Sequence, residues 1–401
     1  MRNTDKKANI VCLSNQLWDY PLWTNKRHVM GRLAKRGFNV LFVDPPINTG
    51  RLFFKHLVAG RWSLKRLLTW IYQDDSVTIF SPLNFVPSNT FLIKLFTKKI
   101  KKIATKKFDK RLKTILWVYH VEMDGLQEMI DSIKHDILVY DCVDNYPAFP
   151  KHDSASKKEK VIKQEEMLTK KADIVFATAP GLVDKLVRLN TKTFYTPNVG
   201  DYERFSKVKE YANQIPTDIT SISRPRIVFA GAVDEYKFDK ELVKKIALDH
   251  PNYSFIIIGP AALKDREASA KELGFERIDN IYFLGTRPDD LMPKYCAGTD
   301  VFIIPYQLND YTVGGCFPVK FHEALAAGLP VVVTDLPAYK SFADVCYISK
   351  GYNDFSQNIR RALEEDNTQK IKERMLVAKE NNWEDKVDNM LFLIDSEVTP
   401  L

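Results

Sequence analysis

The chain has 401 residues, of which 45% are hydrophobic and 27% are charged, and its formal net charge is +8. That length accommodates two globular domains. No apolar stretch approaches the roughly 20 residues that cross a bilayer, and the N-terminus lacks the apolar core of a signal peptide. The five cysteines are scattered and show no metal-ligand spacing, so we expect free thiols in a reducing compartment. The positive charge suits anionic lipid, nucleotide phosphates or nucleic acid and does not choose among them.

Short apolar strands alternate with helical stretches along the whole chain. In the first half we expect strands at Ile10–Leu13, Val40–Val43, Val77–Phe80, Ile115–Tyr119, Ile137–Tyr140 and Ile174–Ala177. In the second half we expect them at Ile227–Ala230, Ser254–Ile258, Ile281–Leu284, Val301–Ile304, Val331–Val333 and Val345–Ile348. This alternation predicts an α/β fold with two doubly wound parallel sheets, whose ligands bind at the carboxyl ends of the strands.

A polar, irregular stretch between Glu203 and Arg224 separates the two halves. We therefore predict a first domain at residues 1–205 and a second at residues 206–380. The final helical stretch, Asn367 to Asp395, has no strand after it. Residues 381–401 are accordingly predicted to form a C-terminal helix outside the second sheet.

The segment Tyr311–Pro337, YTVGGCFPVKFHEALAAGLPVVVTDLP, is the most informative part of the sequence. Thr312, Gly314 and Gly315 predict a glycine loop whose backbone N–H groups point outward. The β-branched run Val331–Val333 predicts a strand that is covered on both faces.

Between this loop and this strand, the sequence from Pro318 to Gly328 predicts a short helix. A loop followed by a helix N-terminus is a ready site for a diphosphate. Within the helix, Lys320 supplies a cation for phosphate and Glu323 a carboxylate that accepts from ribose hydroxyls. The alternative is an exposed helical pair, worth only about 0.2–0.5 kcal/mol.

The segment Tyr311–Pro337 resembles the donor-site motif of retaining GT-B glycosyltransferases of the group 1, or family 4, type. Its order of Pro, Lys and Glu is similar to that of teichuronic-acid and capsular polysaccharide transferases. Glu323 falls on the second motif glutamate, which in the family holds the nucleotide ribose. The first glutamate, which in the family touches the donor sugar, falls on Gly315 and is absent. The resemblance implies a GT-B fold of two Rossmann-like domains facing a central cleft, with acceptor bound by residues 1–205 and nucleotide sugar by residues 206–380. It also implies that the C-terminal helix packs back on the first domain.

The segment Ile227–Phe238, IVFAGAVDEYKF, resembles the first strand and loop of the family's donor domain. There Gly231 matches the glycine that allows close approach of the donor. Lys237 is the expected cation for the diphosphate, although lysines are common and it is as compatible with an ordinary surface position. The resemblance implies these donor-binding residues: Gly231, Lys237, Thr312, Gly314, Gly315, Cys316, Lys320 and Glu323.

Three polar residues follow predicted strands in the first half. His120 comes after TILWVY, and Asp141 and Asp144 come after ILVY. The carboxyl ends of parallel strands are where α/β enzymes place reactive groups, so these residues are candidate catalytic groups for positioning or deprotonating an acceptor hydroxyl. The alternatives stay open, since such an aspartate often caps a helix and a lone histidine often satisfies a local hydrogen bond.

Two segments combine basic and apolar residues. Phe91–Lys113 contains a single acid and repeats its apolar residues at nearly helical spacing, and Arg51–Tyr72 mixes aromatics, leucines and basic residues. Both predict contact with an anionic membrane surface beside a lipid-linked acceptor. The alternative is an amphipathic helix packed on the sheet with a solvated basic face.

We interpret the chain as a cytoplasmic hexosyltransferase that is peripheral at the inner face of the cell membrane. Its donor is a nucleotide sugar, with a UDP-sugar favoured, and its acceptor is a lipid-linked envelope or capsular glycan; the resemblance implies retention of anomeric configuration. No metal or other cofactor is expected, because no Asp-x-Asp pair follows an apolar strand. Motifs for ATP hydrolysis, nicotinamide chemistry and nucleic-acid binding are also missing from the sequence.

Two other functions remain open. One is a sugar-nucleotide epimerase of the same fold, which would consume the donor with no acceptor present. The other is a catalytically weak, donor-binding scaffold of a polysaccharide assembly complex, which the lost glutamate at Gly315 motivates.

Overall fold

The computed structural model describes residues 7–20, 23–48, 53, 57–58, 64–84, 90–263, 266–267 and 269–399. The chain divides into two compact units. Unit 1 comprises the described residues within Met1–Thr178, Leu182–Thr196 and Val387–Leu401, and unit 2 comprises those within Ala179–Gly181 and Pro197–Lys386. Apart from the short segment Ala179–Gly181, the chain enters unit 2 at Pro197 and returns to unit 1 at Val387, whereas the sequence predicted these limits at residues 205 and 380.

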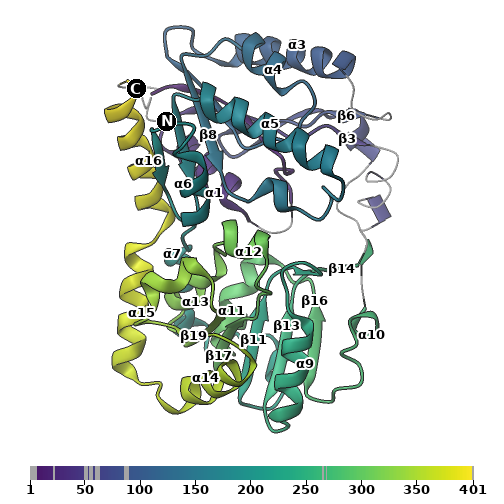
Figure 1. Ribbon diagram of the computed structural model, residues 1–401, viewed down its shortest axis with the longest axis vertical. Helices are drawn as coiled ribbons and strands as arrows, with labels where there is room; N and C mark the ends of the chain where they lie inside the picture. Colours follow the sequence, from purple (N-terminus) through teal and green to yellow (C-terminus); the bar gives the residue numbers. More distant parts are fainter. Residues whose placement is uncertain are drawn as a thin grey trace. The chain divides into compact units, whose positions relative to one another are not determined.

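Unit 1 is built on an eight-stranded sheet with the order β10-β9-β8-β7-β1-β2-β5-β4 (Figure 1). Its strands are β1 Asn9–Leu13, β2 Asn39–Val43, β4 Ile71–Asp74, β5 Val77–Phe80, β7 Thr114–Val118, β8 Ile137–Cys142, β9 Ile174–Ala177 and β10 Thr193–Tyr195. The edge strand β4 runs antiparallel to β5, and the other pairs are parallel. A short pair, β3 Ile47–Asn48 and β6 Leu83–Asn84, lies outside this sheet.

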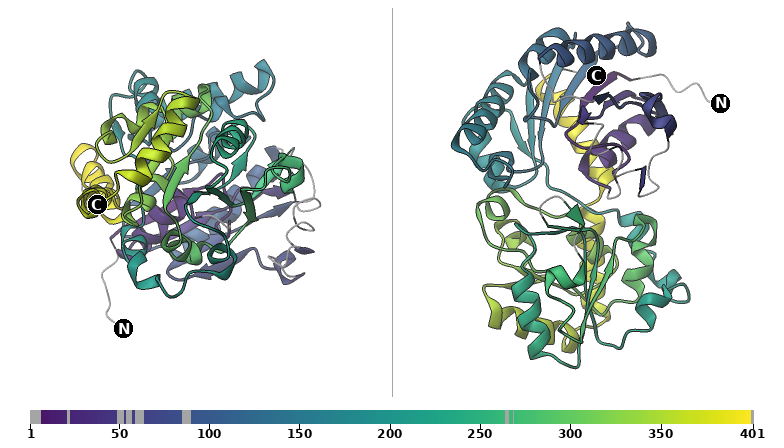
Figure 2. Two further views of the ribbon diagram at one scale, coloured as in Figure 1. Left: turned by 90° about the horizontal axis from the view of Figure 1, so that it is seen from below. Right: turned by 90° about the vertical axis from the view of Figure 1, so that its right-hand side faces the viewer.

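The helices that accompany this sheet cover both of its faces (Figure 2). They are α1 Asn25–Lys35, α3 Thr90–Lys107, α4 Leu126–Ser132, α5 Ala155–Lys171, α6 Pro180–Leu186 and α16 Trp383–Glu397, with 3-10 turns η1 Leu64–Leu67 and η2 Tyr146–Ala148. The C-terminal part of α16 belongs to unit 1, where Arg36 pairs with Asp388 at 3.0 Å. Near its end, Lys113 Nζ donates to Thr399 Oγ1 at 2.8 Å.

Unit 2 is built on a six-stranded parallel sheet with the order β16-β13-β11-β17-β18-β19. Its strands are β11 Arg226–Ala230, β13 Ser254–Ile258, β16 Ile281–Gly285, β17 Val301–Ile304, β18 Val331–Thr334 and β19 Tyr347–Ser349. Three short strands form a separate sheet, β12 Val233–Asp234, β14 Ala261–Leu263 and β15 Arg266–Glu267.

Unit 2 contains helices before, between and after these parallel strands. They are α7 Tyr202–Phe205, α8 Thr217–Thr220, α9 Lys240–Asp249, α10 Ala270–Leu273, α11 Met292–Ala297, α12 Asp310–Gly315, α13 Lys320–Ala326, α14 Tyr352–Glu364 and α15 Thr368–Glu380, with 3-10 turns η3 Val208–Tyr211, η4 Asp289–Leu291 and η5 Pro337–Phe342. The doubly wound α/β fold predicted from the sequence is confirmed. The sequence prediction missed the edge strands β4 and β10, and the strand predicted at Val345–Ile348 runs from Tyr347 to Ser349 instead.

Candidate active site

The loops after β11 and β13 lie backbone against backbone at the carboxyl end of the unit 2 sheet. Gly231 and Gly259 have φ angles of +148° and +144°, which glycine adopts far more readily than other residues. The Gly231 N–H donates to the Ile258 carbonyl at 2.7 Å. A Cβ atom on Gly259 would lie 1.9 Å from the carbonyl oxygen of Gly231. A side chain on Gly259 would therefore push the Gly231 loop out of place.

The ammonium of Lys320 occupies the space that a side chain on Gly231 would fill. A Cβ atom on Gly231 would lie 1.8 Å from Lys320 Nζ. That nitrogen also lies 4.2 Å from the centroid of the Phe229 ring, within range of a cation–π contact. Lys320 makes no hydrogen bond or ion pair within the part of the chain that the structure describes. Its charge is thus available to an anionic ligand at the Gly231 loop.

The environment of Lys320 disfavours its charged form. Burial lowers the pKa of Lys320 to about 7, and the positive charge of Lys237 acts in the same direction. Near neutral pH the side chain is therefore divided between the ammonium and the amine. An anion bound against it would favour the ammonium and raise this pKa.

Lys237, the second predicted cation, has a partner within unit 2. Its Nζ lies 2.7 Å from Asp234 Oδ2, and its backbone carbonyl accepts from the Gln307 N–H at 2.7 Å. Burial opposes the charge on Lys237, but Tyr306 and Asp234 together raise its pKa well above the usual value. Lys237 therefore stays protonated, and Asp234 offsets part of its charge.

Residues 310–315 form the short helix α12, so the predicted glycine loop is wrong. Asn309 caps this helix, because its side chain accepts from the backbone N–H groups of Tyr311 and Thr312. In return, the Thr312 side chain accepts from the Asn309 N–H at 3.0 Å, which completes a capping box. The Thr312 hydroxyl also lies 2.5 Å from the Gln307 carbonyl, to which it donates. Thr312, expected at the donor, thus serves first to fix the start of α12.

Gly314 and Gly315 lie in the last turn of α12, and Cys316 is its C-cap. The Cys316 N–H donates to the Thr312 carbonyl at 3.2 Å. The Thr312 N–H likewise donates to Asn309 Oδ1 at 3.1 Å, so the prediction of outward-pointing N–H groups is wrong at Thr312. Donor binding by Gly314, Gly315 and Cys316 stays a prediction.

Aromatic packing fixes α13, the helix that carries Lys320 and Glu323. His322 has no exposed surface, and burial lowers its pKa to about 3. The rings of Phe317 and Phe342 lie 5.3 and 5.0 Å from the His322 ring. His322 is therefore a neutral core residue, and Lys320 and Glu323, three residues apart, lie on the less buried face of the helix.

The Glu323 carboxylate is half-buried, with no hydrogen bond or ion pair to a described residue. Burial, and then the negative charge of Asp289, raise the pKa of Glu323 to about 8, while Arg204 acts in the opposite direction. Hydroxyl groups that donate to this carboxylate would favour its ionised form. Such a group is what a ribose diol offers.

Arg204 and Asp289, two charged residues near Glu323, were not predicted from the sequence. Arg204 Nη1 lies 2.7 Å from Asp289 Oδ2, and Nη2 donates to the Asp289 carbonyl at 2.6 Å. Arg204 comes close to α13 because the preceding Gly200 lies against its backbone, where a Cβ atom would be 2.8 Å from the His322 carbonyl carbon. Neither charged residue belongs to a motif, so only the tertiary structure reveals this neighbourhood.

Unit 1 places His120, Asp141 and Asp144 at the carboxyl ends of β7 and β8. Asp141 has no exposed surface, and its Oδ2 accepts from Trp117 Nε1 at 3.2 Å. Asp144 and His120 are half-buried. A substrate can therefore reach Asp144 and His120 more readily than it can reach Asp141.

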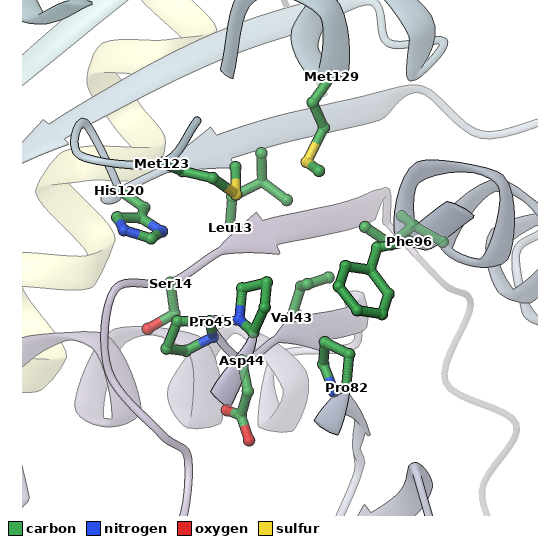
Figure 3. Close-up of a pocket in the computed structure, with 12 residues that line it drawn as sticks. Leu13, Ser14, Val43, Asp44, Pro45, Pro82, Phe96, His120, Met123 and Met129 are labelled. Carbon is green, nitrogen blue, oxygen red and sulfur yellow. The ribbon is translucent and has the colours of Figure 1, made fainter. Parts of the chain in front are cut away.

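His120 borders an apolar pocket at this edge of the unit 1 sheet (Figure 3). Leu13, Phe96, Met123 and Met129 are among the residues that line it. The cavity is only about 10 Å³, so side chains fill the pocket and leave no room for a sugar. Burial lowers the pKa of His120 to about 4, which keeps its imidazole neutral and able to accept a proton.

The predicted basic segment Phe91–Lys113 contains α3, which ends at Lys107. The buried face of this helix carries Ile93, Phe96, Thr97, Ile100 and Ile103. The exposed face carries Lys94, Lys98, Lys99, Lys101, Lys102, Lys106 and Lys107. Phe91 and Leu95 are 69% and 47% exposed among these lysines.

The second basic segment, Arg51–Tyr72, lies largely outside the described residues. Of its described part, Leu64 and Leu68 are 67% and 90% exposed. Among the helices that the structure describes, none combines the length and the apolar character needed to cross a membrane.

Residues 224–365, most of unit 2, match the family model described as Glycosyl transferases group 1. A Bacillus subtilis (strain 168) protein named teichuronic acid biosynthesis glycosyltransferase TuaH is 32% identical over 213 residues. That alignment covers 51% of this chain and 51% of the relative, so the chain matches about half the length of that curated protein.

Solved structures share the fold over nearly the whole chain. Sucrose-phosphate synthase from Thermosynechococcus elongatus matches with a TM-score of 0.68 and 15% identity, covering 96% of this chain and 97% of its own. HepE from Anabaena, solved in complex with UDP-glucose, matches with a TM-score of 0.65 and 15% identity, covering 97% and 99%. Residues 224–365 thus match the group 1 glycosyltransferases, and nearly the whole chain shares the GT-B fold of these solved structures.

Proposed function

We propose that the protein is a retaining glycosyltransferase that moves a sugar from a nucleotide-activated donor to an acceptor hydroxyl. The observation that carries this proposal is a pair of ionisable side chains on α13, Lys320 and Glu323, neither of which makes a hydrogen bond or ion pair with a described residue. A nucleoside diphosphate offers the complementary groups. Its phosphates accept from an ammonium, and its ribose hydroxyls donate to a carboxylate.

The leaving group defines the main electrostatic requirement of the reaction. Negative charge grows on the nucleoside diphosphate as the glycosidic bond breaks, and cations at that place stabilise the transition state. Lys320 and Lys237 supply this charge, and Gly231 lets the diphosphate approach the backbone. Retention follows the family pattern, in which the departing phosphate helps to accept the acceptor proton.

The donor and acceptor classes are inferred from the relatives. HepE was solved with UDP-glucose, which favours a UDP-sugar as donor here. The name of TuaH refers to teichuronic acid, which favours an envelope polysaccharide as acceptor. We place the acceptor on unit 1, where the neutral imidazole of His120 and the carboxylate of Asp144 position and partly deprotonate its hydroxyl.

We further propose that α3 contacts an anionic membrane surface, where a lipid-linked acceptor would be held. Its exposed face combines seven lysines with the apolar side chains of Phe91 and Leu95. Lysines attract anionic headgroups, and exposed apolar side chains enter the interface between headgroups and acyl chains.

Calorimetric titration with UDP, GDP and ADP at matched salt tests the donor site. We expect UDP to bind selectively, and Lys320→Met and Glu323→Gln each to weaken binding at least about tenfold. Lys340→Met and Glu364→Gln, at exposed positions of unit 2, serve as matched controls and should leave the affinity unchanged. The proposal fails if none of the three nucleotides binds the native protein, or if the control variants lose affinity as well.

The absence of a carboxylate at Gly315 favours a second candidate, a donor-binding scaffold with little catalysis. UDP-glucose binding without turnover, in the presence of membranes that contain acceptor, would support the scaffold. Consumption of UDP-glucose without any acceptor would indicate an epimerase or another reaction that needs no transfer.

A further inference from the structure

Lys26, in the first turn of α1, is a deeply buried lysine with no counter-ion among the described residues. Its side chain is 6% exposed, and it makes no hydrogen bond or ion pair in the described part of the chain. Lys26 Nζ lies 5.4 Å from the centroid of the Tyr119 ring. An ammonium this deeply buried loses most of its hydration, which is costly unless another group replaces the water.

The position of Lys26 is the edge of the unit 1 sheet where β1, β7 and β8 end. Burial lowers the pKa of Lys26, while the charges of Asp144 and Asp141 act against that shift. The charge of Lys26 also acts on His120. Lys26 is therefore close to the groups that we place at the acceptor, at the edge of the sheet where doubly wound domains bind ligands.

Another buried charge of unit 1 shows what a structural role requires. Glu165 is 3% exposed, and its carboxylate accepts from Tyr140 Oη at 2.9 Å and from Lys185 Nζ at 2.8 Å. Lys26 has three N–H donors, and none of them is used within the described residues. A structural ion pair therefore does not account for Lys26.

We propose that Lys26 binds an oxyanion of the substrate, and this inference rests on the function proposed above. Two features of the structure point to an anion. Among the described residues no counter-charge contacts the ammonium, and the first turn of α1, an 11-residue helix, adds the positive end of the helix dipole at the same place. Asp144 and the neutral His120 nearby supply groups that bind hydroxyls, as a sugar that carries the anion would need.

The oxyanion has two possible sources, which share the same chemistry. One is the carboxylate of an acidic acceptor sugar, and the other is a phosphate of the donor. Each replaces the lost hydration of Lys26 by charge-assisted hydrogen bonds.

Binding of three probes to the full chain separates these sources: UDP, inorganic pyrophosphate and methyl β-glucuronide, the last measured by saturation-transfer NMR. Lys26→Met keeps the length of the side chain without its charge, and Lys26→Arg keeps the charge. Lys35→Met, at the exposed end of the same helix, is the matched control. We expect Lys26→Met to weaken the binding of at least one probe about tenfold or more. Lys26→Arg should retain part of that binding, and Lys35→Met should leave the affinity for every probe unchanged.

Loss of glucuronide binding with UDP binding intact would assign the acceptor carboxylate, and loss of UDP and pyrophosphate binding would assign the donor phosphate. If the native protein binds UDP and Lys26→Met binds every probe as the native protein does, the Lys26 proposal is overturned while the glycosyltransferase proposal stands. If the native protein does not bind UDP, the glycosyltransferase proposal fails. The effect of Lys26→Met on pyrophosphate and glucuronide binding then tests whether Lys26 binds an oxyanion.

Thermal unfolding tests whether Lys26 has only a structural role. Lys26→Met removes a buried charge that makes no ion pair with a described residue, so we expect the unfolding midpoint to stay the same or to rise. A large fall in the midpoint would show that the ammonium stabilises the fold, and the proposal would then be abandoned.

Discussion

Binding of UDP should move protons in opposite directions at two residues of α13. Lys320 has a pKa of about 7 and Glu323 a pKa of about 8 because partial burial disfavours the charged form of each side chain. A diphosphate raises the pKa of Lys320, so Lys320 takes up a proton. Ribose hydroxyls that donate to Glu323 lower its pKa, so Glu323 releases a proton.

The magnitudes follow from these two pKa values. At pH 7.5, about one quarter of Lys320 is protonated in the free protein, so complete protonation on binding takes up roughly three quarters of a proton. At the same pH about three quarters of Glu323 is protonated, so complete ionisation releases roughly the same amount. The two flows should nearly cancel in the native protein.

Single substitutions separate the proton uptake by Lys320 from the proton release by Glu323. Lys320→Met should leave net release of protons at pH 7.5, and Glu323→Gln should leave net uptake. The measurement is calorimetric titration with UDP in phosphate and in Tris, two buffers whose ionisation enthalpies differ widely. The reasoning is refuted if both variants bind UDP and neither shows a buffer-dependent enthalpy, or if the two variants shift the enthalpy in the same direction.

Three further outcomes test other parts of the structure. Gly259→Ala should lower the free energy of unfolding by roughly 2–3 kcal/mol, because its Cβ would collide with the Gly231 carbonyl. At Gly351 a Cβ has open space, so Gly351→Ala should change the free energy of unfolding little. Urea unfolding of the two variants tests this difference. Asp141→Asn should lower the free energy of unfolding by about 1–3 kcal/mol because it disturbs a buried hydrogen bond, while Asp144→Asn should lower turnover with little loss of stability. Replacing the exposed lysines of α3 by glutamine should weaken binding to anionic vesicles by about 1 kcal/mol for each lysine near the surface, and equal binding to neutral vesicles would contradict the electrostatic argument.

The interior of both sheets was predictable because its strands are buried along their whole length. The apolar runs ILVY in β8 and FIII in β13 mark these strands in the sequence, and the structure buries every residue of both strands. The edge strand β4, Ile71–Asp74, alternates exposed and half-buried residues and so lacks that signal. Fold class therefore follows from the central strands, and the edges depend on tertiary pairing.

Some residues of the candidate site could be predicted from local sequence, and others only from the tertiary structure. Lys320 and Glu323 were predictable because two residues three positions apart on one short helix carry opposite charges, with a glycine-rich segment before them. The helix α12 was missed although Asn309 and Thr312 have the spacing of a capping box, because the glycines were given more weight than the cap. Lys26, Arg204 and Asp289 had no local signal, since their importance depends on burial and on neighbours distant in the sequence.

The charges left without partners also predict how ligand and stability are linked. The buried ammonium of Lys320 costs free energy in the empty protein, so Lys320→Met should raise the stability of unit 2 without ligand. At a UDP concentration of 100 times the dissociation constant, the native protein should gain about 2.7 kcal/mol. At the same concentration a variant that binds tenfold more weakly should gain only about 1.4 kcal/mol. Thermal unfolding with and without UDP measures both differences. If Lys320→Met is less stable than the native protein and UDP stabilises both proteins equally, Lys320 contributes to the fold and not to donor binding.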